Sequence, residues 1–424
     1  MSKLDVLVIG GGIGGLCLAQ GLKKAGVNVA VYERDATPIS RLQGFRVHIS
    51  PEGSTALHAC LPPELWMIFN STGGAFVRGF TMVTEQLKEL LHATSDDDGS
   101  TDQPIARHRS VSRITLRHIL LSGLESIVHF KKRFVRYEEA RGRLVAHFED
   151  GSTAEGDVLV GADGVNSPVR KQYLPHAEPI DTGITIIGGK VPLSDGALAL
   201  LPARLLDGPI AVMPPEACSL FMAVWKREAG GGEYLRMLGL DGSNPEDEDY
   251  VILALGAKRE FFGFRSDPVT MRGEELKDVV RRKVTRWHPS LRKLVELIDE
   301  TQIALARIRT SEPVEAWTTT RVTLLGDAIH SMTPYRGIGA NIALQDAALL
   351  CSKLGEADRG EKPVLEAIAE YETAMRQYGY TAVASSLRAM EQATGEKGPA
   401  FGLTKTALRV MNALPALRRR AMTA

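Results

Sequence analysis

A glycine-rich hexapeptide near the start of the sequence has the composition of a phosphate-binding turn. Gly10-Gly11-Gly12-Ile13-Gly14-Gly15 fits the pattern GxGxxG and directly follows the apolar run from Val6 to Ile9. Glycines let the backbone approach a pyrophosphate, whose charge meets free N–H groups at a helix start. Glu33 ends the next apolar run, where a carboxylate accepts hydrogen bonds from an adenosine ribose. These residues predict a dinucleotide site without separating FAD from NAD; the alternative is a turn that only packs a helix on a strand.

Two further segments place polar residues directly after buried strands. The segment from Val158 to Arg170 contains Asp163-Gly164, followed by Ser167 in the position of a helix N-cap. The segment from Leu324 to Asn341 contains Gly326-Asp327 in a loop that leads to a helix opened by small residues. We expect Asp163 in a sharp turn after a buried strand and Asp327 in a loop after another strand; an ordinary turn aspartate is the alternative for Asp163.

The first of these motifs lies in a predicted βαβ unit. The run ending at Ile9 is typical of a buried strand, Ile13 to Ala25 has helical spacing of apolar residues, and Gly26 should end the helix. Val27 to Tyr32 is again apolar and β-branched. Strand, helix and strand within 33 residues imply a parallel sheet.

The rest of the sequence predicts a second, mixed sheet and a helical end. Glu149 to Ser152 is a hairpin signal between runs at Leu144 to Phe148 and Ala154 to Val160. Val322 to Leu325 predicts another buried strand, after which nearly everything is helix-like. Between residues 171 and 308 we expect one helix, Glu274 to Val284, and strand-like pieces at Ile184 to Ile187, Ile210 to Met213, Leu220 to Trp225 and Phe261 to Phe264.

Composition favours a small-molecule partner. The formal net charge of zero gives no field to attract nucleic acid or anionic membrane. Four scattered cysteines without a CxxC pair argue against a disulfide framework, a metal site or a dithiol redox pair. The glycine turn interrupts the only signal-like stretch, and no other segment approaches a membrane span, so we expect a cytoplasmic protein.

The three segments, in this order, resemble the GxGxxG, DG and GD fingerprints of the group A flavin-dependent monooxygenases, which have the p-hydroxybenzoate hydroxylase fold. The resemblance covers roughly residues 3 to 385. It implies an α/β fold in which a Rossmann-type FAD-binding domain is interleaved with a mixed β-sheet substrate domain. We expect a discontinuous FAD domain at 1–72, 104–171 and 309–385, and a substrate domain at 73–103 and 172–308.

The resemblance also implies a set of residues around noncovalent FAD. The glycine turn would lie against the pyrophosphate, Glu33 on the ribose, and Asp327 on the ribityl and pyrophosphate region. Small residues after the GD loop would face the isoalloxazine ring, where helix N–H groups stabilise negative charge on reduced flavin. The full set is Gly10, Gly12, Ile13, Gly14, Gly15, Glu33, Arg34, Arg46, Arg113, Asp163, Asp327, Pro334, Gly337, Gly339, Ala340 and Asn341.

No side chain is assigned as catalytic, because no Ser/His/Asp array and no metal-ligand cluster is visible. The resemblance implies that NADH or NADPH reduces FAD and that O2 then forms a C4a-hydroperoxyflavin, which hydroxylates or epoxidises a bulky aromatic or polyketide-like compound. An FAD-dependent dehydrogenase, reductase or oxidase is the alternative, and a non-catalytic flavin-binding protein is a third. His330 in the GD loop is either a general base or a residue that supports the loop. His48 either projects toward the flavin or lies on a polar surface.

The last segment and the predicted substrate sheet leave alternatives open. Phe401 to Arg420 has apolar residues at helical spacing, and Pro415 should kink or end this helix. We expect residues 386–424 to brace the two domains, as in compact antibiotic-modifying monooxygenases; a membrane-surface helix is the alternative. Apolar residues of the middle sheet suit a polycyclic ligand or serve as core: Ile210, Val212, Met213, Leu220, Phe221, Met222, Val224 and Trp225.

Overall fold

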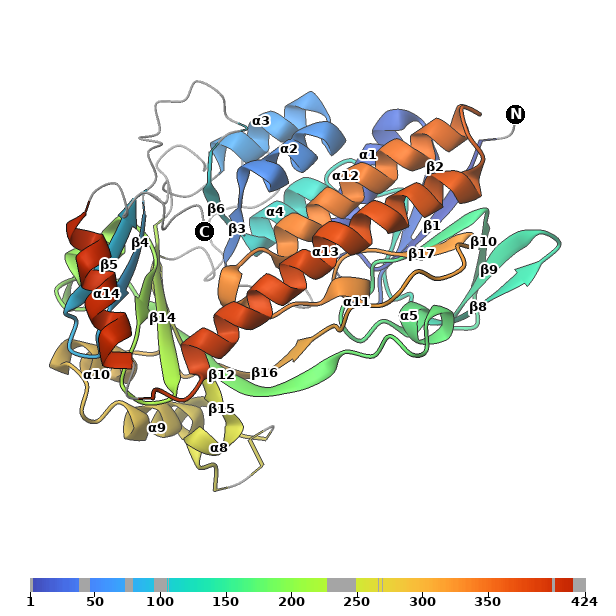
Figure 1. Ribbon diagram of the computed structural model, residues 1–424. Helices are drawn as coiled ribbons and strands as arrows, with labels where there is room; N and C mark the ends of the chain where they lie inside the picture. The colour runs from blue at the N-terminus through green and yellow to red at the C-terminus, as the bar shows by residue number, and fades with distance from the viewer. Residues whose placement is uncertain are drawn as a thin grey trace.

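The computed structural model contains a parallel sheet and a larger mixed sheet, joined by long helices (Figure 1). It describes residues 3–37, 46–72, 79–94, 105, 107–226, 249–265, 267–268, 270–398 and 401–414. Several sequence expectations fall on other residues and lie outside this description: the end of the predicted final helix beyond Leu414, including Pro415, and part of the predicted substrate segment at 73–103.

The parallel sheet confirms the predicted βαβ unit. Helix α1 (Ile13–Ala25) has the expected bounds, and Gly26 ends it in the left-handed region with φ of 79°. Apolar side chains of the strands and α1 form one buried core. The strand order is β17 (Val322–Leu324), β11 (Val158–Gly161), β1 (Asp5–Ile9), β2 (Asn28–Tyr32) and β7 (Val128–His129).

The predicted strand from Ala154 to Val160 is two strands in the structure. β10 (Thr153–Gly156) is partly exposed and pairs antiparallel with β9, whereas every residue of β11 is buried in the parallel sheet. Asp157 lies at the break, where its backbone N–H donates to the Asp5 carbonyl oxygen at 2.7 Å. The chain therefore passes from one sheet into another at this residue. The small sheet is completed by β8 (Phe134–Ala140) and β9 (Arg143–Phe148).

The mixed sheet has seven strands, and one face of it is covered by two helices. α9 (Gly273–Lys283) and α10 (Pro289–Glu296) pack on this outer face and share a core with strand residues such as Leu220 and Met222. The strand order is β16 (Ala304–Thr310), β12 (Ile180–Pro192), β15 (Tyr250–Lys258), β14 (Cys218–Trp225), β13 (Ile210–Val212), β4 (Gly79–Val83) and β5 (Glu89–Thr94).

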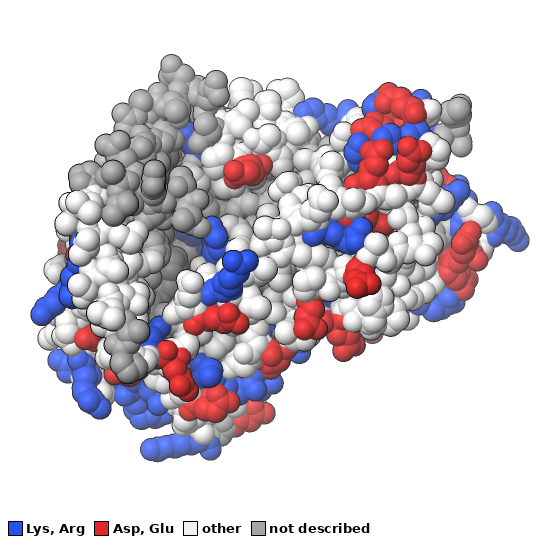
Figure 2. Space-filling view, in the orientation of Figure 1, with Lys and Arg blue, Asp and Glu red and all other residues white. Residues whose placement is uncertain are grey.

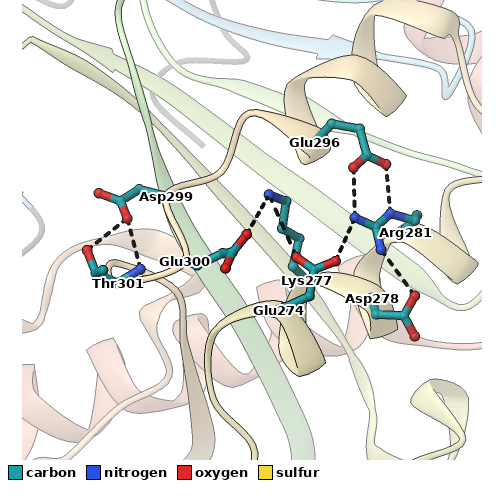
Figure 3. Close-up of polar contacts among 8 residues, drawn as sticks. All are labelled: Glu274, Lys277, Asp278, Arg281, Glu296, Asp299, Glu300 and Thr301. Atoms are coloured by element: carbon teal, nitrogen blue, oxygen red, sulfur yellow. Dashed lines mark hydrogen bonds and ion pairs between the residues drawn. The ribbon is translucent and has the colours of Figure 1, made fainter.

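Two differences from the sequence expectations lie in this sheet and its cover. β15 and α10 were not among the predicted elements, although β15 occupies a central position in the sheet. The expected strand at Phe261 to Phe264 was wrong, because α8 (Arg259–Phe262) forms there and Gly263 ends it with φ of 59°. Ion pairs on the exposed side of the cover connect α9 to α10, with Arg281 Nε 2.7 Å from Glu296 Oε1 (Figure 3).

The remaining elements lie around these sheets. β3 (Arg46–Ile49) and β6 (Arg109–Ser112) form a separate antiparallel pair. The other helices of the described chain are α2 (Pro51–Cys60), α3 (Pro63–Ser71), α4 (Arg113–Leu121), α5 (Pro168–Tyr173), α6 (Asp195–Leu198), η2 (Ala203–Leu206), α11 (Asp327–His330), η4 (Pro334–Arg336), α12 (Gly339–Asp358), α13 (Val364–Thr394) and α14 (Phe401–Ala413).

The structure corrects the expected position of the last helix. α14 lies against the edge strand β5, where Asn412 accepts the N–H of His92 at 2.9 Å and donates to Glu89 at 2.9 Å. Its apolar stripe faces solvent instead of the domain junction, with Leu403 73% exposed. α13 spans the junction instead: it packs along α12 and reaches the mixed sheet, where Met390 contacts Ile184 (Figure 1).

The surface agrees with the absence of net charge. On the face drawn in Figure 2, basic and acidic side chains are interspersed. Among the described residues, none of the helices combines the length and the apolar character that crossing a membrane would require.

Two helical glycines provide a matched test of the packing. A Cβ at Gly21 of α1 would lie 2.7 Å from Cys351 Sγ and 3.0 Å from Cys60 Sγ, whereas a Cβ at Gly402 of α14 meets nothing within 4 Å. We expect Gly21→Ala to lower the free energy of unfolding by about 1–3 kcal/mol through overpacking. Gly402→Ala should leave it unchanged or raise it by up to about 1 kcal/mol. Urea unfolding of both variants measures this, and equal effects would contradict the packing described.

Candidate cofactor and substrate site

The glycine turn leaves one side of the helix start open. Gly10 has φ of 114°, and a Cβ there would lie 2.3 Å from the Ala162 carbonyl oxygen, so the turn packs tightly on β11. Gly12 is exposed, and a Cβ on it would meet nothing within 4 Å. No side chain caps the first turn of α1, which begins at the buried Ile13. The N–H groups at this helix start therefore face open space, which fits a pyrophosphate.

The other glycines of the motif have a packing role. A Cβ on Gly14 would lie 2.5 Å from the Leu325 side chain, and one on Gly15 would lie 2.2 Å from the Gly10 carbonyl oxygen. Both residues thus allow α1 to approach the turn and the GD strand. The predicted glycines therefore have two roles. Gly12 lies at the open surface, whereas Gly14 and Gly15 allow close packing of α1 on its neighbours.

Glu33 is fixed by the backbone beside the glycine turn. Its two carboxylate oxygens accept the N–H of Gly11 at 2.7 Å and the N–H of Asp35 at 2.9 Å. The guanidinium of Arg117 lies 3.9 Å from Glu33 and 3.8 Å from Asp35. Each carboxylate oxygen can accept further bonds, so the arrangement fits a ribose diol. Arg34 is exposed at the surface, and its position indicates no specific role.

The DG segment is connected to the GD segment through a buried arginine. Arg170 is 1% exposed and donates to the carbonyl oxygens of Ala328 at 2.8 Å and Val165 at 2.9 Å. Asp163 Oδ2 accepts the N–H of Val169 at 3.2 Å, while its buried Oδ1 has no hydrogen-bond partner among the described residues. Burial raises the pKa of Asp163. This oxygen is available to accept a hydrogen bond from a bound cofactor or from water.

The side chain of Asp327 has solvent-accessible surface, but many protein atoms lie around its carboxyl group. It is the first residue of α11, and its desolvated surroundings raise its carboxyl pKa, while His330 and Arg113 oppose this rise. Arg113, also exposed, begins α4 and is close enough to act electrostatically on Asp327. The structure therefore brings together two of the predicted residues from distant parts of the sequence, at an open surface within the protein.

The loop that carries Asp327 is held by a buried carboxylate that sequence analysis missed. Asp346 of α12 accepts hydrogen bonds from the Gly326 N–H at 2.8 Å, from the Tyr378 hydroxyl at 2.6 Å, and pairs with His330 Nε2 at 2.6 Å. Burial alone would lower the pKa of His330, but the Asp346 carboxylate raises it. His330 is 1% exposed, so the geometry favours its supporting role over that of a general base.

The residues after the GD loop form a second open helix start. Gly337 is exposed and has φ of 64°, and α12 begins at Gly339 without a capping side chain. Pro334 begins η4 and is exposed, and Ala340 is half-buried. The side chain of Asn341 is occupied elsewhere: it donates to the His48 carbonyl oxygen at 2.8 Å and accepts the Ser50 N–H at 2.9 Å. The side chain of Asn341 thus positions β3, and the free N–H groups remain for a ligand.

β3 directs Arg46 toward the mixed sheet. The guanidinium of Arg46 donates to the Ser110 carbonyl oxygen and lies 5.3 Å from the centroid of the Trp225 ring. His48 Nε2 is 3.0 Å from His108 Nδ1, and the two rings stack. Burial, together with the neighbouring His108, lowers the pKa of His48 to about 4, and Glu52 opposes this shift. His48 is therefore a half-buried strand residue and not an exposed loop residue.

The inner face of the mixed sheet, opposite α9 and α10, is turned toward these elements. Ladder partners Gly188, Ala254 and Phe221 lie on it, and Phe221 is 41% exposed. Trp225 lies on the same face, below Arg46. The apolar residues that sequence analysis grouped together therefore separate: Ile210, Val212, Leu220 and Met222 are core residues of the outer face, and Phe221 and Trp225 lie on the inner face.

The functional residues that sequence analysis missed have only weak signals in the sequence. Arg117 follows Arg113 by one helical turn, and Arg170 ends the DG segment. Asp346 is a charged residue on a side of α12 that is otherwise apolar, between Leu344 and Ala347. Such a residue indicates a buried polar contact, but its partners come from residues 326, 330 and 378, which only the fold brings together.

Comparisons with known proteins identify the family of the chain. Residues 269–386 match the FAD binding domain family, and residues 8–66 match the NAD(P)-binding Rossmann-like domain family. The crystal structure of a protein from Photorhabdus luminescens, assigned as a FAD-containing monooxygenase, is 36% identical. It has a TM-score of 0.81, and the alignment covers 92% of this chain and 99% of that one.

Other relatives extend the comparison. A dual O-methyltransferase/FAD-dependent monooxygenase of Phaeosphaeria nodorum is 33% identical over 82% of this chain, which spans only 40% of the length of that relative. A 6-hydroxynicotinate 3-monooxygenase of Bordetella bronchiseptica is 27% identical, with 82% of each protein covered. HpxO of Klebsiella pneumoniae, crystallised with FAD and uric acid, is 22% identical with a TM-score of 0.77 over 98% of this chain and 95% of that one, which shows the fold.

The different surroundings of Asp327 and His330 predict different defects. Asp327→Ala should reduce FAD occupancy strongly but change the unfolding free energy of the FAD-free protein by only about 0.5 kcal/mol, because the residue is exposed. His330→Ala should lower that free energy by about 3–5 kcal/mol, because it breaks a buried pair. The flavin absorbance per folded protein and urea unfolding measure both quantities. Equal flavin loss in the two folded variants would contradict this assignment.

The lowered pKa of His48 predicts a pH-dependent contribution to stability. As the pH falls from about 6.5 to about 4, the unfolded chain takes up a proton at this histidine and the folded chain does not. This site should therefore destabilise the fold by up to about 3 kcal/mol across that window, with no further loss below it.

The measurement compares wild type with His48→Gln in urea at pH 7 and pH 4.5. The stability advantage of wild type over the variant should be smaller at the lower pH. His176→Gln, at an exposed histidine, is measured in the same way as the control for replacing a histidine. A constant difference for His48→Gln would show that the histidine pair does not exclude the proton.

Proposed function

This chain belongs to the FAD-dependent monooxygenases, and from that premise we propose that it inserts one oxygen atom of O2 into a bulky aromatic or polyketide-like molecule, with NADH or NADPH as reductant. The observation that carries the proposal is the opposition of two surfaces. The open helix starts and Asp327 lie on one side, and the inner sheet face with the exposed Phe221 lies on the other. FAD, when bound, supplies the redox chemistry and the activation of O2.

The residues of the chain bind the cofactor and orient it. We propose that the uncapped start of α1 and Gly12 hold the pyrophosphate, and that Glu33 accepts from the ribose hydroxyls. Asp327 and Arg113 would contact the middle of the cofactor. The free N–H groups at the start of α12 would lie near N1 and O2 of the ring, where they stabilise the negative charge of the reduced flavin. Binding is noncovalent in this proposal, because every one of these contacts is a hydrogen bond or an electrostatic contact.

The inner face of the sheet supports the class of substrate. The exposed ring of Phe221 supplies aromatic surface, and its ladder partners Ala254 and Gly188 place little side-chain bulk beside it. The relatives include monooxygenases named for 6-hydroxynicotinate and dual enzymes that also carry an O-methyltransferase. 6-Hydroxynicotinate is an aromatic ring that bears a hydroxyl group, and we propose an oxygen-substituted aromatic compound as the substrate class here.

The test supplies purified, FAD-loaded protein with NADPH or NADH, isotopically labelled O2 and a panel of polycyclic phenols and quinones. The expected result is a product heavier by one labelled oxygen atom, formed with consumption of the nicotinamide. Acid precipitation of the same preparation should release free FAD. A product oxidised without labelled oxygen would support the alternative, a dehydrogenase or oxidase, and would overturn this proposal.

Asp327→Ala reconstituted with excess FAD is the matched control. Because Asp327 is proposed to hold the cofactor, its activity should recover as FAD is added, with the same product mass. Nicotinamide consumption that yields only hydrogen peroxide with every compound of the panel would also contradict the proposed class of substrate.

A further inference from the structure

Two lysines of the mixed-sheet part are buried to the same extent but have different partners. Lys277 of α9 is 7% exposed and Lys190 of β12 is 8% exposed. Lys277 Nζ has Glu300 Oε1 at 3.5 Å and Glu274 Oε2 at 3.9 Å (Figure 3). Lys190 has no ion pair or side-chain hydrogen bond with any residue that the structure describes; its Nζ lies 4.8 Å from the centroid of the Tyr250 ring. Lys190 is therefore a largely buried lysine whose ammonium has no carboxylate partner in the described part of the chain.

The ammonium at the end of this largely buried side chain is less well hydrated than one at the open surface. The face of one aromatic ring returns only part of that loss. Carboxylates normally accompany such groups, as Lys277 illustrates. The missing partner of Lys190 is thus a feature that a bound anion would complete.

Lys190 is located on the inner face of the sheet. It pairs in register with Ile252, which in turn pairs with Ala223, and the next ladder position on this face holds Tyr250 and Trp225. The rings of Tyr250 and Trp225 are 5.6 Å apart, and Arg46 of β3 lies over Trp225. Two rings flanked by two cations therefore reach from β12 of the mixed sheet to β3.

The same face is open to a ligand beside this row. Phe221 lies on it, two residues before Ala223 along β14, and is 41% exposed. The outer face offers no comparable surface, because α9 and α10 bury it. A planar molecule on Phe221 would present its edge toward Lys190.

We propose that Lys190 binds an anionic oxygen substituent of the substrate, a carboxylate or an ionised phenol or enol, while the exposed ring of Phe221 receives its polycyclic body and the buried rings of Tyr250 and Trp225 hold Lys190 and Arg46 in place. This inference rests on the proposed function for the identity of the bound molecule as a substrate. It names the substrate class more narrowly: the compound is anionic at neutral pH, and Lys190 distinguishes it from neutral analogues of the same shape.

The experiment measures binding to oxidised, FAD-loaded protein without a nicotinamide, by calorimetry and by the change in flavin absorbance. The probes are matched pairs: hydroxynaphthoate and its primary amide, anthraquinone carboxylate and its carboxamide, and a hydroxynaphthoquinone and its methyl ether. Wild type should bind the anionic member of at least one pair more tightly. Lys190→Met should weaken binding of that anion by about tenfold or more and change the neutral member by less than about twofold.

Two variants control the interpretation. Lys190→Arg keeps the charge and should retain most of the preference, and Lys277→Met removes the paired buried lysine and should leave both affinities unchanged. Lys190→Met should also melt at or above the temperature of wild type, because it removes an unpaired buried charge.

The inference is overturned if no pair shows preference for its anion, if Lys190→Met weakens both members equally, or if this variant melts several degrees lower. The proposed function is tested separately. Anion-selective binding lost in Lys190→Met would stand even if no product gained oxygen. Oxygenation with unchanged anion affinity in Lys190→Met would refute this inference alone.

Discussion

The carboxylate of Asp346 is the interaction on which the arrangement of the site depends. It is fully buried, and it accepts from the backbone of Gly326, from Tyr378 of α13 and from His330. These bonds join the residue that precedes α11, the short helix α11 itself and the long helices α12 and α13 at one point. A buried charge with all its bonds made holds one conformation, because any other would leave it unsatisfied. The loop between Gly326 and His330 is therefore fixed while Asp327, in the middle of it, stays free for a ligand.

Elsewhere around the site, too, some groups are bonded or packed within the protein while neighbouring groups stay accessible. Gly14 and Gly15 bring α1 close to its neighbours, and Gly12 remains open. Arg170 joins the DG and GD segments, and Asp163 keeps one oxygen without a partner among the described residues. Asn341 holds β3 with its side chain, and the helix start before it is uncapped. The fold supplies rigid supports, and the groups left over are those that we propose to contact the dinucleotide and the substrate.

Local sequence patterns were enough to predict the βαβ unit and the three fingerprints, because each of them consists of residues close together in the sequence. The bounds of α1 and its end at Gly26 follow from spacing and one glycine. The contacts of Asp346, Arg170 and Lys190 were not predictable, since their partners are distant in the sequence. The position of α14 was wrong for a related reason: an apolar stripe predicts a helix but not which surface it meets, and Asn412 fixes it on β5 while the stripe stays exposed. The residues of the inner and outer sheet faces could be told apart only once the strand register was known.

The most direct measurement of the central claim is FAD affinity in Asp346→Asn. This substitution keeps the shape of a residue that we place behind the GD loop and not against the cofactor, but it removes the charge that pairs with His330. If the carboxylate fixes the loop so that Asp327 and the start of α12 can bind FAD, titration of the FAD-free folded variant should give a Kd at least about tenfold higher than that of wild type. An unchanged Kd in a variant that remains folded would contradict the account.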